Sequence, residues 1–296
     1  MEKVLITGGT GLIGTYLRNE LHRRGYGTVI LSRRSGTGLV KWDVENEFIA
    51  SDAFDGVNHI IHLAGENVAD KRWSEARKKS ILESRTKSAQ LILNELQVRN
   101  IHLKTFVSAS AVGYYGTVTG DILFVETTPG GNDFLADVCQ KWEQSALALT
   151  NVADRVCILR TGLVLALNGG LLKRLLLPAK MGISVVFGDG KQFMPWIHIK
   201  DLCNMYIKSI EDGNFSGIYN AVSPNSVTNR EFSDILGKAL NKRQLIIKIP
   251  QIVVSIIFGE LGQVLVSGSK ISAKKIIEAA YEFEFTDLEK AFRDLI

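Results

Sequence analysis

The chain is poor in cysteine and proline and contains no long uninterrupted hydrophobic run. Its 296 residues include 3 cysteines and 5 prolines. Three cysteines cannot form a disulfide framework in a chain of this length, and no signal peptide precedes the first strand pattern, so we expect a cytoplasmic protein. The most apolar late segment, residues 249–266, is broken by Glu260 and by glycines. It is shorter than the roughly 20 apolar residues that a membrane span needs, so we expect a buried helix and no membrane partner.

A strong excess of charge of one sign is also missing. The net charge is +4, 22% of the residues are charged and 46% are hydrophobic, as in ordinary soluble globular proteins. The basic cluster at residues 71–87 is best explained as the solvated face of a helix, so nucleic acid is not an expected partner. His59 and His62 flank a buried strand pattern without further metal-ligating neighbours, and we expect no metal site.

In the first half of the chain, short apolar runs alternate with helical patterns. This alternation predicts an α/β fold, with a doubly wound parallel sheet of the Rossmann type and helices on both faces. The expected strands cover residues 3–8, 27–32, 38–43, 57–65, 103–110 and 155–162. The expected helices cover residues 12–25, 74–100 and 137–150.

After about residue 165 the alternation loosens, which predicts a second, smaller lobe. We expect a Rossmann domain over residues 1–165 and a smaller α+β substrate lobe over 166–296. Segments near 196–222 are expected to return to the first domain. Pro178 lies inside a leucine-rich helical pattern and is expected to interrupt or kink that helix.

Helix starts are marked by side chains that can cap a helix. Thr228 and Glu231 have the spacing of a capping box, and so do Thr286 and Glu289. Asp201 precedes a helical pattern and is expected to be its N-cap.

The sequence TGGTGLIG, residues 7–14, follows an expected strand and opens an expected helix. Gly8 permits a tight turn, Gly11 lets the backbone approach a pyrophosphate, and Gly14 lets helix and strand pack closely. The start of the helix adds unpaired N–H donors and the positive end of the helix dipole. The motif predicts a dinucleotide site with contacts from Gly8, Thr10, Gly11, Leu12, Ile13 and Gly14.

The end of the second expected strand indicates which dinucleotide binds. NAD sites place a carboxylate there to accept hydrogen bonds from the ribose 2′-hydroxyl. This chain has Ser32, Arg33 and Arg34 instead. A guanidinium beside a hydroxyl suits a 2′-phosphate, so we expect NADP with Arg33 as the main contact. The alternative is that the arginines only solvate the strand end.

Two further groups are placed near the adenosine half. Asp43, after the third expected strand, could touch the adenine edge or be an exposed turn aspartate. The run Leu63, Ala64 and Gly65 ends the fourth expected strand, where small residues let the backbone lie against the ribose.

The chain resembles the short-chain dehydrogenase/reductase superfamily, and within it the extended, epimerase-like branch, in TGGTGLIG, HLAG, SASAVGYYG, and PWIHIKDL followed by YNAVSPNSVTNREF. More narrowly it resembles an epimerase-like family of NADP-binding proteins with a C-terminal domain of unknown function. The motifs of that narrower resemblance are GENVADKRW, ILESR, FLADVCQKWE and IFGELGQVLVSGSKISAKKI. The resemblance covers essentially the whole chain. It implies cofactor contacts from Ser32, Arg33, Leu63, Ala64, Arg85 and Val164.

The resemblance also identifies a missing catalytic pair. The superfamily uses a tyrosine and a lysine four residues later, and similar enzymes of the extended branch have a glutamate four residues after the lysine. With Glu143 in that place, Leu135 and Cys139 replace the pair on one helix face. Leucine cannot transfer a proton, and a buried cysteine is expected to serve packing.

Other hydroxyl groups could replace the lost acid or base. Ser110 is similar in place to the superfamily's catalytic serine. Tyr114 and Tyr115 follow on the loop above the sheet edge and could supply a proton or merely close the pocket. His198 is expected to be a hydrogen-bonded structural group.

Two hypotheses remain open from the sequence. The first is an NADP(H)-dependent oxidoreductase or epimerase that acts by hydride transfer on a small polar or nucleotide-sugar-like substrate. The second is a non-catalytic NADPH-binding sensor or scaffold, which Leu135 and Cys139 favour. A homodimer through the long helix and the one near Trp142 is compatible with either.

Overall fold

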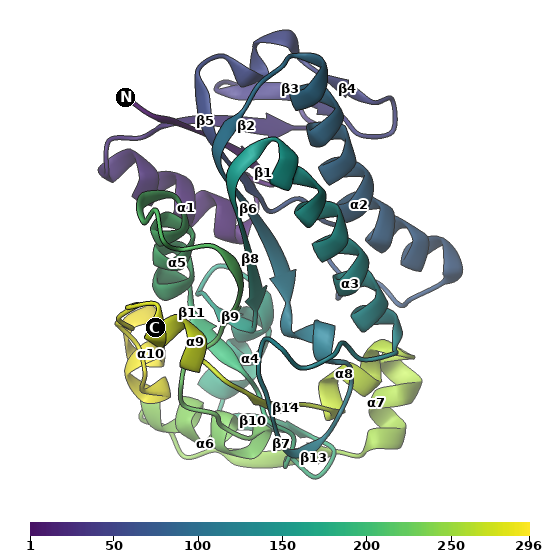
Figure 1. Ribbon diagram of the computed structural model, residues 1–296. Coiled ribbons are helices and arrows are strands. Elements are labelled where there is room, and N and C mark those ends of the chain that lie inside the picture. Colours follow the sequence, from purple (N-terminus) through teal and green to yellow (C-terminus); the bar gives the residue numbers. More distant parts are fainter.

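The computed structural model describes residues 1–296 and is built around one eight-stranded sheet (Figure 1). In space its strands follow the order β12-β8-β6-β5-β1-β2-β3-β4, and every neighbouring pair is parallel except β3 and β4. The predicted α/β Rossmann fold is therefore confirmed. The strands of this sheet are β1 Lys3–Thr7, β2 Gly27–Ser32, β3 Leu39–Asp43, β4 Phe48–Ile49, β5 Val57–His62, β6 Leu103–Ala111, β8 Ala153–Thr161 and β12 Gly217–Ala221.

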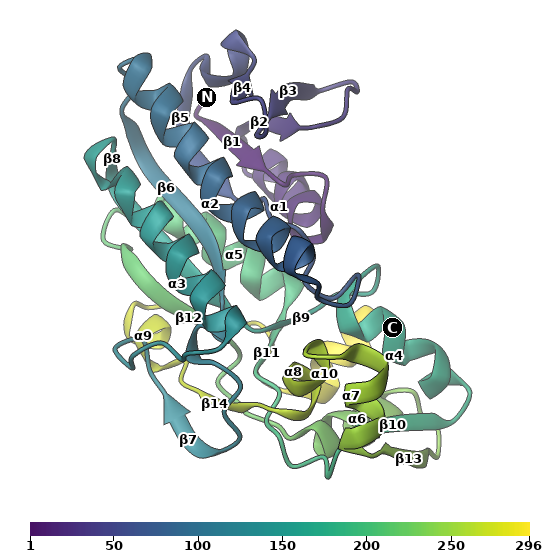
Figure 2. The same cartoon turned by 90° about the vertical axis from the view of Figure 1, so that its right-hand side faces the viewer.

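Helices cover both faces of the sheet (Figures 1 and 2). Helices α1 (Leu12–Arg23) and α5 (Ile199–Glu211) pack together on one face, and α2 (Glu75–Val98) and α3 (Phe134–Leu147) pack together on the other. Strand order reverses between β1 and β5, because β2 to β4 lie on one side of β1 and β5, β6 and β8 on the other. Ligands of doubly wound sheets bind at the carboxyl edge beside this reversal.

Strand β1 shows that the sheet is buried on both faces. Val4, Leu5 and Ile6 have no exposed surface. Val4 and Ile6 belong to the core beneath α1 and α5, whereas Leu5 belongs to the core beneath α2. Alternate side chains of a strand point to opposite faces, so a continuous apolar run is what a central parallel strand requires.

The smaller lobe lies below the carboxyl edge of the sheet and is built from short paired strands and helices (Figure 2). Its three two-stranded ribbons, β7–β14, β9–β11 and β10–β13, are all parallel. Their bounds are β7 Gly120–Phe124, β9 Leu163–Leu165, β10 Ile183–Phe187, β11 Trp196–His198, β13 Leu245–Ile249 and β14 Ser269–Ile271. The helices are α4 Gly170–Lys180, α6 Asn229–Ala239, α7 Gln251–Phe258, α8 Leu261–Val266, α9 Lys274–Glu278 and α10 Leu288–Leu295. Short 3-10 turns are η1 Ser51–Phe54, η2 Val112–Tyr115 and η3 Ala148–Asn151.

Within residues 196–222, β12 pairs with β8 of the main sheet and α5 packs on α1. Pro178 lies within α4, which continues to Lys180 before it ends. The expected interruption of the helix at Pro178 is therefore wrong, because the helix continues past this residue.

Some details differ from the prediction. The capping box of Thr228 and Glu231 is confirmed, but the second box is wrong, because Asp287 rather than Thr286 caps α10. The N-cap of α5 is His198, not Asp201. Asp201 is buried and its carboxylate accepts hydrogen bonds from the Tyr281 hydroxyl and from the backbone N–H groups of Glu284 and Phe285.

The late apolar segment is also not one buried helix. It forms α7 and α8, joined at Gly259, and Val254 is the one buried residue of α7. Ile252 and Ile256 of α7 are 74% and 68% exposed. No helix of the chain combines the length and the apolar character that crossing a membrane requires.

Candidate functional site

The glycine turn between β1 and α1 has the tight backbone that the motif predicts. Gly8 has a φ of 68°, and a Cβ built on it would lie 2.9 Å from the Leu63 carbonyl. A Cβ on Gly14 would lie 2.5 Å from the Gly8 oxygen. Gly11 is the N-cap of α1 and provides no side-chain cap, so the first N–H groups of the helix stay free for an anion. The cradle therefore fits a pyrophosphate.

The remaining residues of this turn line its open side. Thr10 and Gly11 are exposed, whereas Leu12 and Ile13 are half-buried. Leu12 packs against Gly169, where a Cβ would lie 3.0 Å from the leucine side chain. The start of α4 is thereby held close to the glycine turn.

The end of β5 is fixed to the end of β1 by one buried hydroxyl. The Thr7 Oγ1 accepts from the N–H groups of Leu63 and Ala64, each at 3.1 Å. It also contacts His62 Nδ1 at 2.8 Å, and the other ring nitrogen contacts Ser88 Oγ of α2. Burial lowers the pKa of His62 to about 4, so the ring stays neutral as a structural bridge.

Cations gather at the end of β2, as predicted. Arg33 is highly exposed, and its Nη1 lies 3.5 Å from Glu66 Oε1. The Ser32 hydroxyl accepts from the backbone N–H of exposed Arg34 at 3.0 Å. Lys41, which the prediction missed, pairs in register with Ser32 and donates from Nζ to the Arg33 carbonyl at 2.8 Å. The parallel pairing of the second and third strands was the signal that could have identified it.

Asp43 has a local structural role. Its carboxylate accepts hydrogen bonds from the backbone N–H groups of Glu45 and Asn46 and from the Asn46 side chain. These bonds lower the pKa of Asp43 and close the turn between β3 and β4. The turn alternative considered for this residue matches its contacts.

Arg85 and Gly65 meet beside the glycine turn. A Cβ on Gly65 would lie 2.9 Å from the Arg85 guanidinium carbon. The guanidinium donates to the carbonyls of Ile81 and Glu66 and lies over the Trp142 ring at 4.8 Å. Val164 is the middle residue of β9 and pairs with Ile197 of β11.

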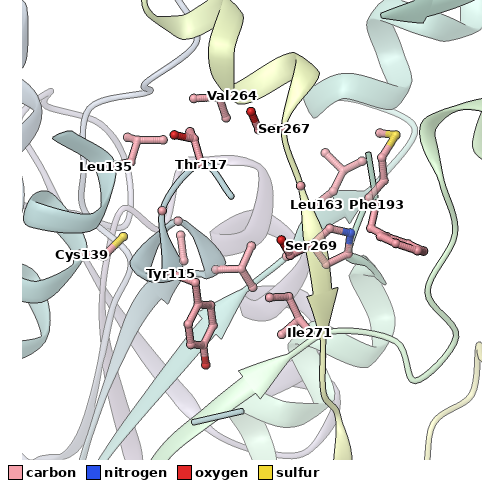
Figure 3. Close-up of a pocket in the computed structure, with 18 of the residues that line it drawn as sticks. Tyr115, Thr117, Leu135, Cys139, Leu163, Phe193, Val264, Ser267, Ser269 and Ile271 are labelled. Carbon is pink, nitrogen blue, oxygen red and sulfur yellow. The ribbon is translucent and has the colours of Figure 1, made fainter. Parts of the chain in front are cut away.

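Leu135 and Cys139 of α3 both line a cavity at the carboxyl edge of the sheet, so the predicted shared face is confirmed (Figure 3). A Cβ on Gly113 would lie 3.5 Å from Leu135 Cβ and 3.7 Å from Cys139 Sγ. Burial raises the pKa of the Cys139 thiol to about 12. Neither side chain can therefore exchange a proton with a substrate near neutral pH.

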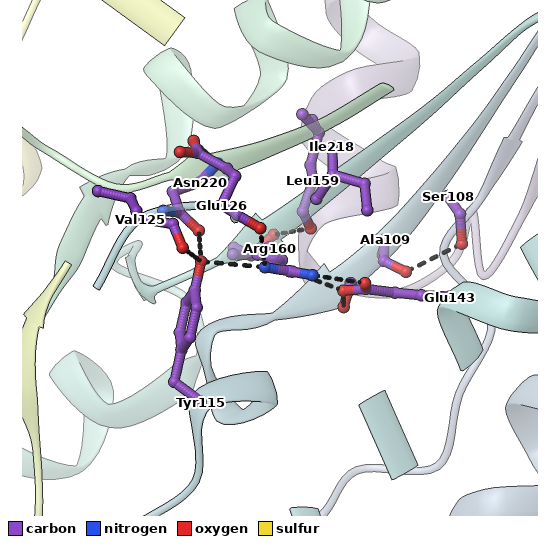
Figure 4. A network of polar contacts seen from close by, with 12 residues as sticks. Ser108, Ala109, Tyr115, Val125, Glu126, Glu143, Leu159, Arg160, Ile218 and Asn220 are labelled. Carbon is purple, nitrogen blue, oxygen red and sulfur yellow. Dashed lines mark hydrogen bonds and ion pairs between the residues drawn. The ribbon is translucent and has the colours of Figure 1, made fainter. Parts of the chain in front are cut away.

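Ser110 and Tyr115 are part of a buried polar network, of which Figure 4 shows Tyr115, Glu143, Arg160 and Asn220. Ser110 Oγ donates to Glu143 at 2.7 Å, and Arg160 forms a two-pronged pair with the same carboxylate at 2.8 and 2.9 Å. Arg160 also donates to the Tyr115 hydroxyl, which contacts Asn220 Oδ1 at 2.8 Å. The Arg160 guanidinium carbon lies 3.4 Å from the centre of the Tyr114 ring.

This network faces away from the cavity. Ser110 and Tyr114 are not among the residues that line it, and Tyr115 lines it while its hydroxyl is held by the network. Burial raises the pKa of Tyr115. The roles predicted for these three residues stay predictions. The hydroxyls of Ser110 and Tyr115 are engaged in the network that joins α3, β6 and β8, whereas Tyr114 contacts Arg160 through its ring.

The cavity itself has a volume of about 420 Å³ and lies between the carboxyl edge of the sheet and the smaller lobe. Hydrophobic residues make up 17 of the 29 that line it, and Arg85 is the one charged side chain among them. Figure 3 shows walls from α3, from the loop at Thr117, from Leu163 and Phe193, and from the C-terminal segment at Val264 to Ile271. The segment after residue 249 thus completes a chamber that the Rossmann domain opens.

Comparison with known proteins identifies the family of this chain. Residues 4–221 match the NAD dependent epimerase/dehydratase family, and residues 249–295 match a domain of unknown function, DUF1731. The human epimerase family protein SDR39U1 is 33% identical over 299 residues, covering 99% of each chain. An epimerase family protein of Mycobacterium leprae is 31% identical over 97% of this chain and 94% of its own.

Solved structures agree. The human protein, crystallised with NADPH, has a TM-score of 0.90 at 32% identity and covers 99% of this chain and 98% of its own. A nucleoside-diphosphate sugar epimerase from Corynebacterium glutamicum has a TM-score of 0.80 at 31% identity, covering 99% of this chain and 58% of its own. The chain therefore belongs to the NAD dependent epimerase/dehydratase family and carries a DUF1731 domain at its C-terminal end.

Proposed function

We propose that the chain binds NADP(H) and acts as an oxidoreductase or epimerase on a small molecule held in the cavity between its two parts. The observation that carries the proposal is the glycine cradle together with the cations at Arg33, Arg34 and Lys41. Clearances at Gly8 and Gly14 leave no room for a side chain, and three positive side chains suit a 2′-phosphate. The NADPH-bound human relative supports the same choice.

When bound, the nicotinamide would exchange a hydride with a substrate carbon, while a proton is gained or lost at the attached oxygen. The protein's own contribution is to hold the substrate and exclude water. Leu135 and Cys139 shield one wall without supplying a proton. A location in the cytoplasm and a homodimer stay predictions.

A direct test compares the affinities of NADPH and NADH. We expect Arg33→Ala and Lys41→Ala each to weaken NADPH binding about tenfold or more, since a charge-assisted hydrogen bond contributes about 1.5–3 kcal/mol. NADH binding should change less than about twofold. Arg293→Ala, a change in α10, is the matched control. Equal losses for both cofactors would reject the assignment of NADP.

The second candidate is a non-catalytic NADPH-binding protein, favoured by the replacement of the proton-transferring pair with Leu135 and Cys139. Absorbance of the reduced nicotinamide, followed with small carbonyl compounds and sugar nucleotides, separates the two. Turnover with any of them supports the enzyme. Tight NADPH binding without turnover supports the sensor.

A further inference from the structure

We propose that the cavity accepts a small, predominantly apolar carbonyl compound or the corresponding alcohol, and not a nucleotide sugar. This substrate class rests on the proposed function, because it concerns the chamber beside the expected nicotinamide site. It departs from the polar substrate that the sequence favours. Charge, hydrogen bonding and wall composition each support it.

Charge is the first consideration. A nucleotide sugar carries a diphosphate, and proteins bind such groups with several cations or with free N–H groups of helix starts. Arg85 is the one charged residue of the cavity wall. Its guanidinium already donates to two carbonyls, at 2.8 Å to Ile81 and 3.1 Å to Glu66. The chamber therefore has no free cation for a diphosphate.

The second consideration is the hydrogen-bonding capacity of the cavity wall. The Thr117 hydroxyl donates to Asp133, and the Ser269 hydroxyl donates to the Val118 carbonyl. The Asn229 amide donates to Met194 Sδ and accepts from the Phe187 N–H. These wall groups are thus already engaged with protein atoms.

The Gln192 amide nitrogen is engaged in the same way, with the carbonyls of Phe187 and Leu265. What remains without a partner on the wall is the buried acceptor Gln192 Oε1, the buried donor Trp142 Nε1 and the Ser267 hydroxyl. That capacity suits two or three polar atoms. A sugar buried here would leave several hydroxyls unpaired, at about 1–3 kcal/mol each.

The third consideration is the composition of the cavity walls. Apolar side chains enter from both parts of the chain: Leu135 and Val138 of α3, Leu163 of β9, Phe193, and Val264 and Leu265 of α8. Burial of an apolar ligand against them contributes about 25 cal/mol per Å². The volume of about 420 Å³ lies near the lower end of the roughly 300–1,000 Å³ of small-molecule pockets. A bulky nucleotide-linked substrate is disfavoured by size as well.

The test uses the full chain saturated with NADPH and measures the melting temperature and NADPH oxidation. The apolar panel is benzaldehyde, acetophenone, cyclohexanone and 2-decanone, and the polar panel is UDP, UDP-glucose and UDP-glucuronic acid. We expect at least one apolar compound to bind and no UDP compound to bind. Stabilisation or turnover by a UDP compound would overturn the proposal, and so would an apolar panel that neither stabilises nor reacts.

Two variants connect the result to the cavity. Val264→Asp places a carboxylate on the wall and should weaken binding of the responding apolar compound at least tenfold. Gln263→Asp, at the neighbouring exposed position of α8, places the same charge in solvent. It should change the affinity for that compound by less than about twofold. Equal effects of the two variants would contradict binding in this chamber. NADPH affinity is measured separately: its absence rejects the proposed function, whereas normal NADPH binding with an inert apolar panel rejects only the substrate class.

Discussion

The Nζ of Lys78 in α2 lies 2.9 Å from the Glu260 carboxylate between α7 and α8. The pair joins the Rossmann domain to the segment whose Val264 and Leu265 line the cavity. Both side chains are partly exposed, and the nearby carboxylate raises the pKa of Lys78. The contact thus holds one wall of the chamber against the other by an ion pair that salt can screen.

Removal of this contact should loosen α7 and α8 without unfolding the protein. We expect Glu260→Gln to change the free energy of unfolding by less than about 1 kcal/mol, as for other exposed pairs. Chymotryptic cleavage after Phe258 should become faster. Lys141→Met, which removes the exposed pair with Asp137 on α3, serves as the control. Cleavage at the wild-type rate in Glu260→Gln would show that the pair does not hold the segment.

The buried pair of Glu143 and Arg160 should respond very differently. Glu143→Leu leaves the guanidinium buried without its carboxylate, so we expect a loss of about 3–5 kcal/mol in urea unfolding. The double variant Glu143→Leu/Arg160→Met removes both charges and should recover most of that loss. A single variant within about 1 kcal/mol of wild type would contradict this account.

Acid should destabilise the fold through His62. Burial depresses its pKa from 6.5 to about 4 in the folded chain. The unfolded chain therefore takes up the proton first, and stability present above pH 6.5 is lost as the pH falls toward 4, by up to about 1.4 kcal/mol per unit. His62→Gln should reduce this slope, measured by urea unfolding at each pH; His198, whose pKa burial also lowers to about 4, contributes to the slope that remains. His102→Gln, at an exposed position, should leave the slope unchanged; a flattened slope there would remove the assignment to His62.

Gly14 should tolerate no side chain. A Cβ there meets the Gly8 oxygen at 2.5 Å, so Gly14→Ala must displace α1 from the turn. We expect a loss of about 1–3 kcal/mol in stability and at least tenfold weaker NADPH binding, measured by fluorescence titration. Gly213→Ala, where a Cβ meets nothing within 4 Å, is the matched control. Normal NADPH affinity in Gly14→Ala would argue against the pyrophosphate cradle.

The Rossmann half was predictable because its signals are local. Buried parallel strands show as continuous apolar runs such as Val4 to Ile6, and the glycine turn has a fixed spacing. The resemblance, with Glu143 in the place of the glutamate of similar enzymes, identified Leu135 and Cys139, and helical periodicity then predicted their shared face. Lys41 was missed because its place beside Arg33 depends on pairing between strands, which no local pattern encodes.

The predictions were wrong where residues far apart in the sequence determine the local structure. Aspartate is a residue type that often caps a helix. The carboxylate of Asp201, however, accepts hydrogen bonds from backbone N–H groups more than 80 residues later, at Glu284 and Phe285. Thr286 and Asp287 are both good capping residues, and only the backbone selects the second. The apolar run at α7 resembles a core helix, yet the lobe offers it little to pack against.

The C-terminal strand β14 pairs with β7, and Asp201 holds residues near Phe285. The two stretches recognised as separate families are thus interlocked across the polypeptide. Severing the chain near residue 248 would strip the first stretch of strand and backbone partners that it cannot replace. Neither half should fold stably when expressed alone, whereas the two halves produced together have the contacts needed to associate.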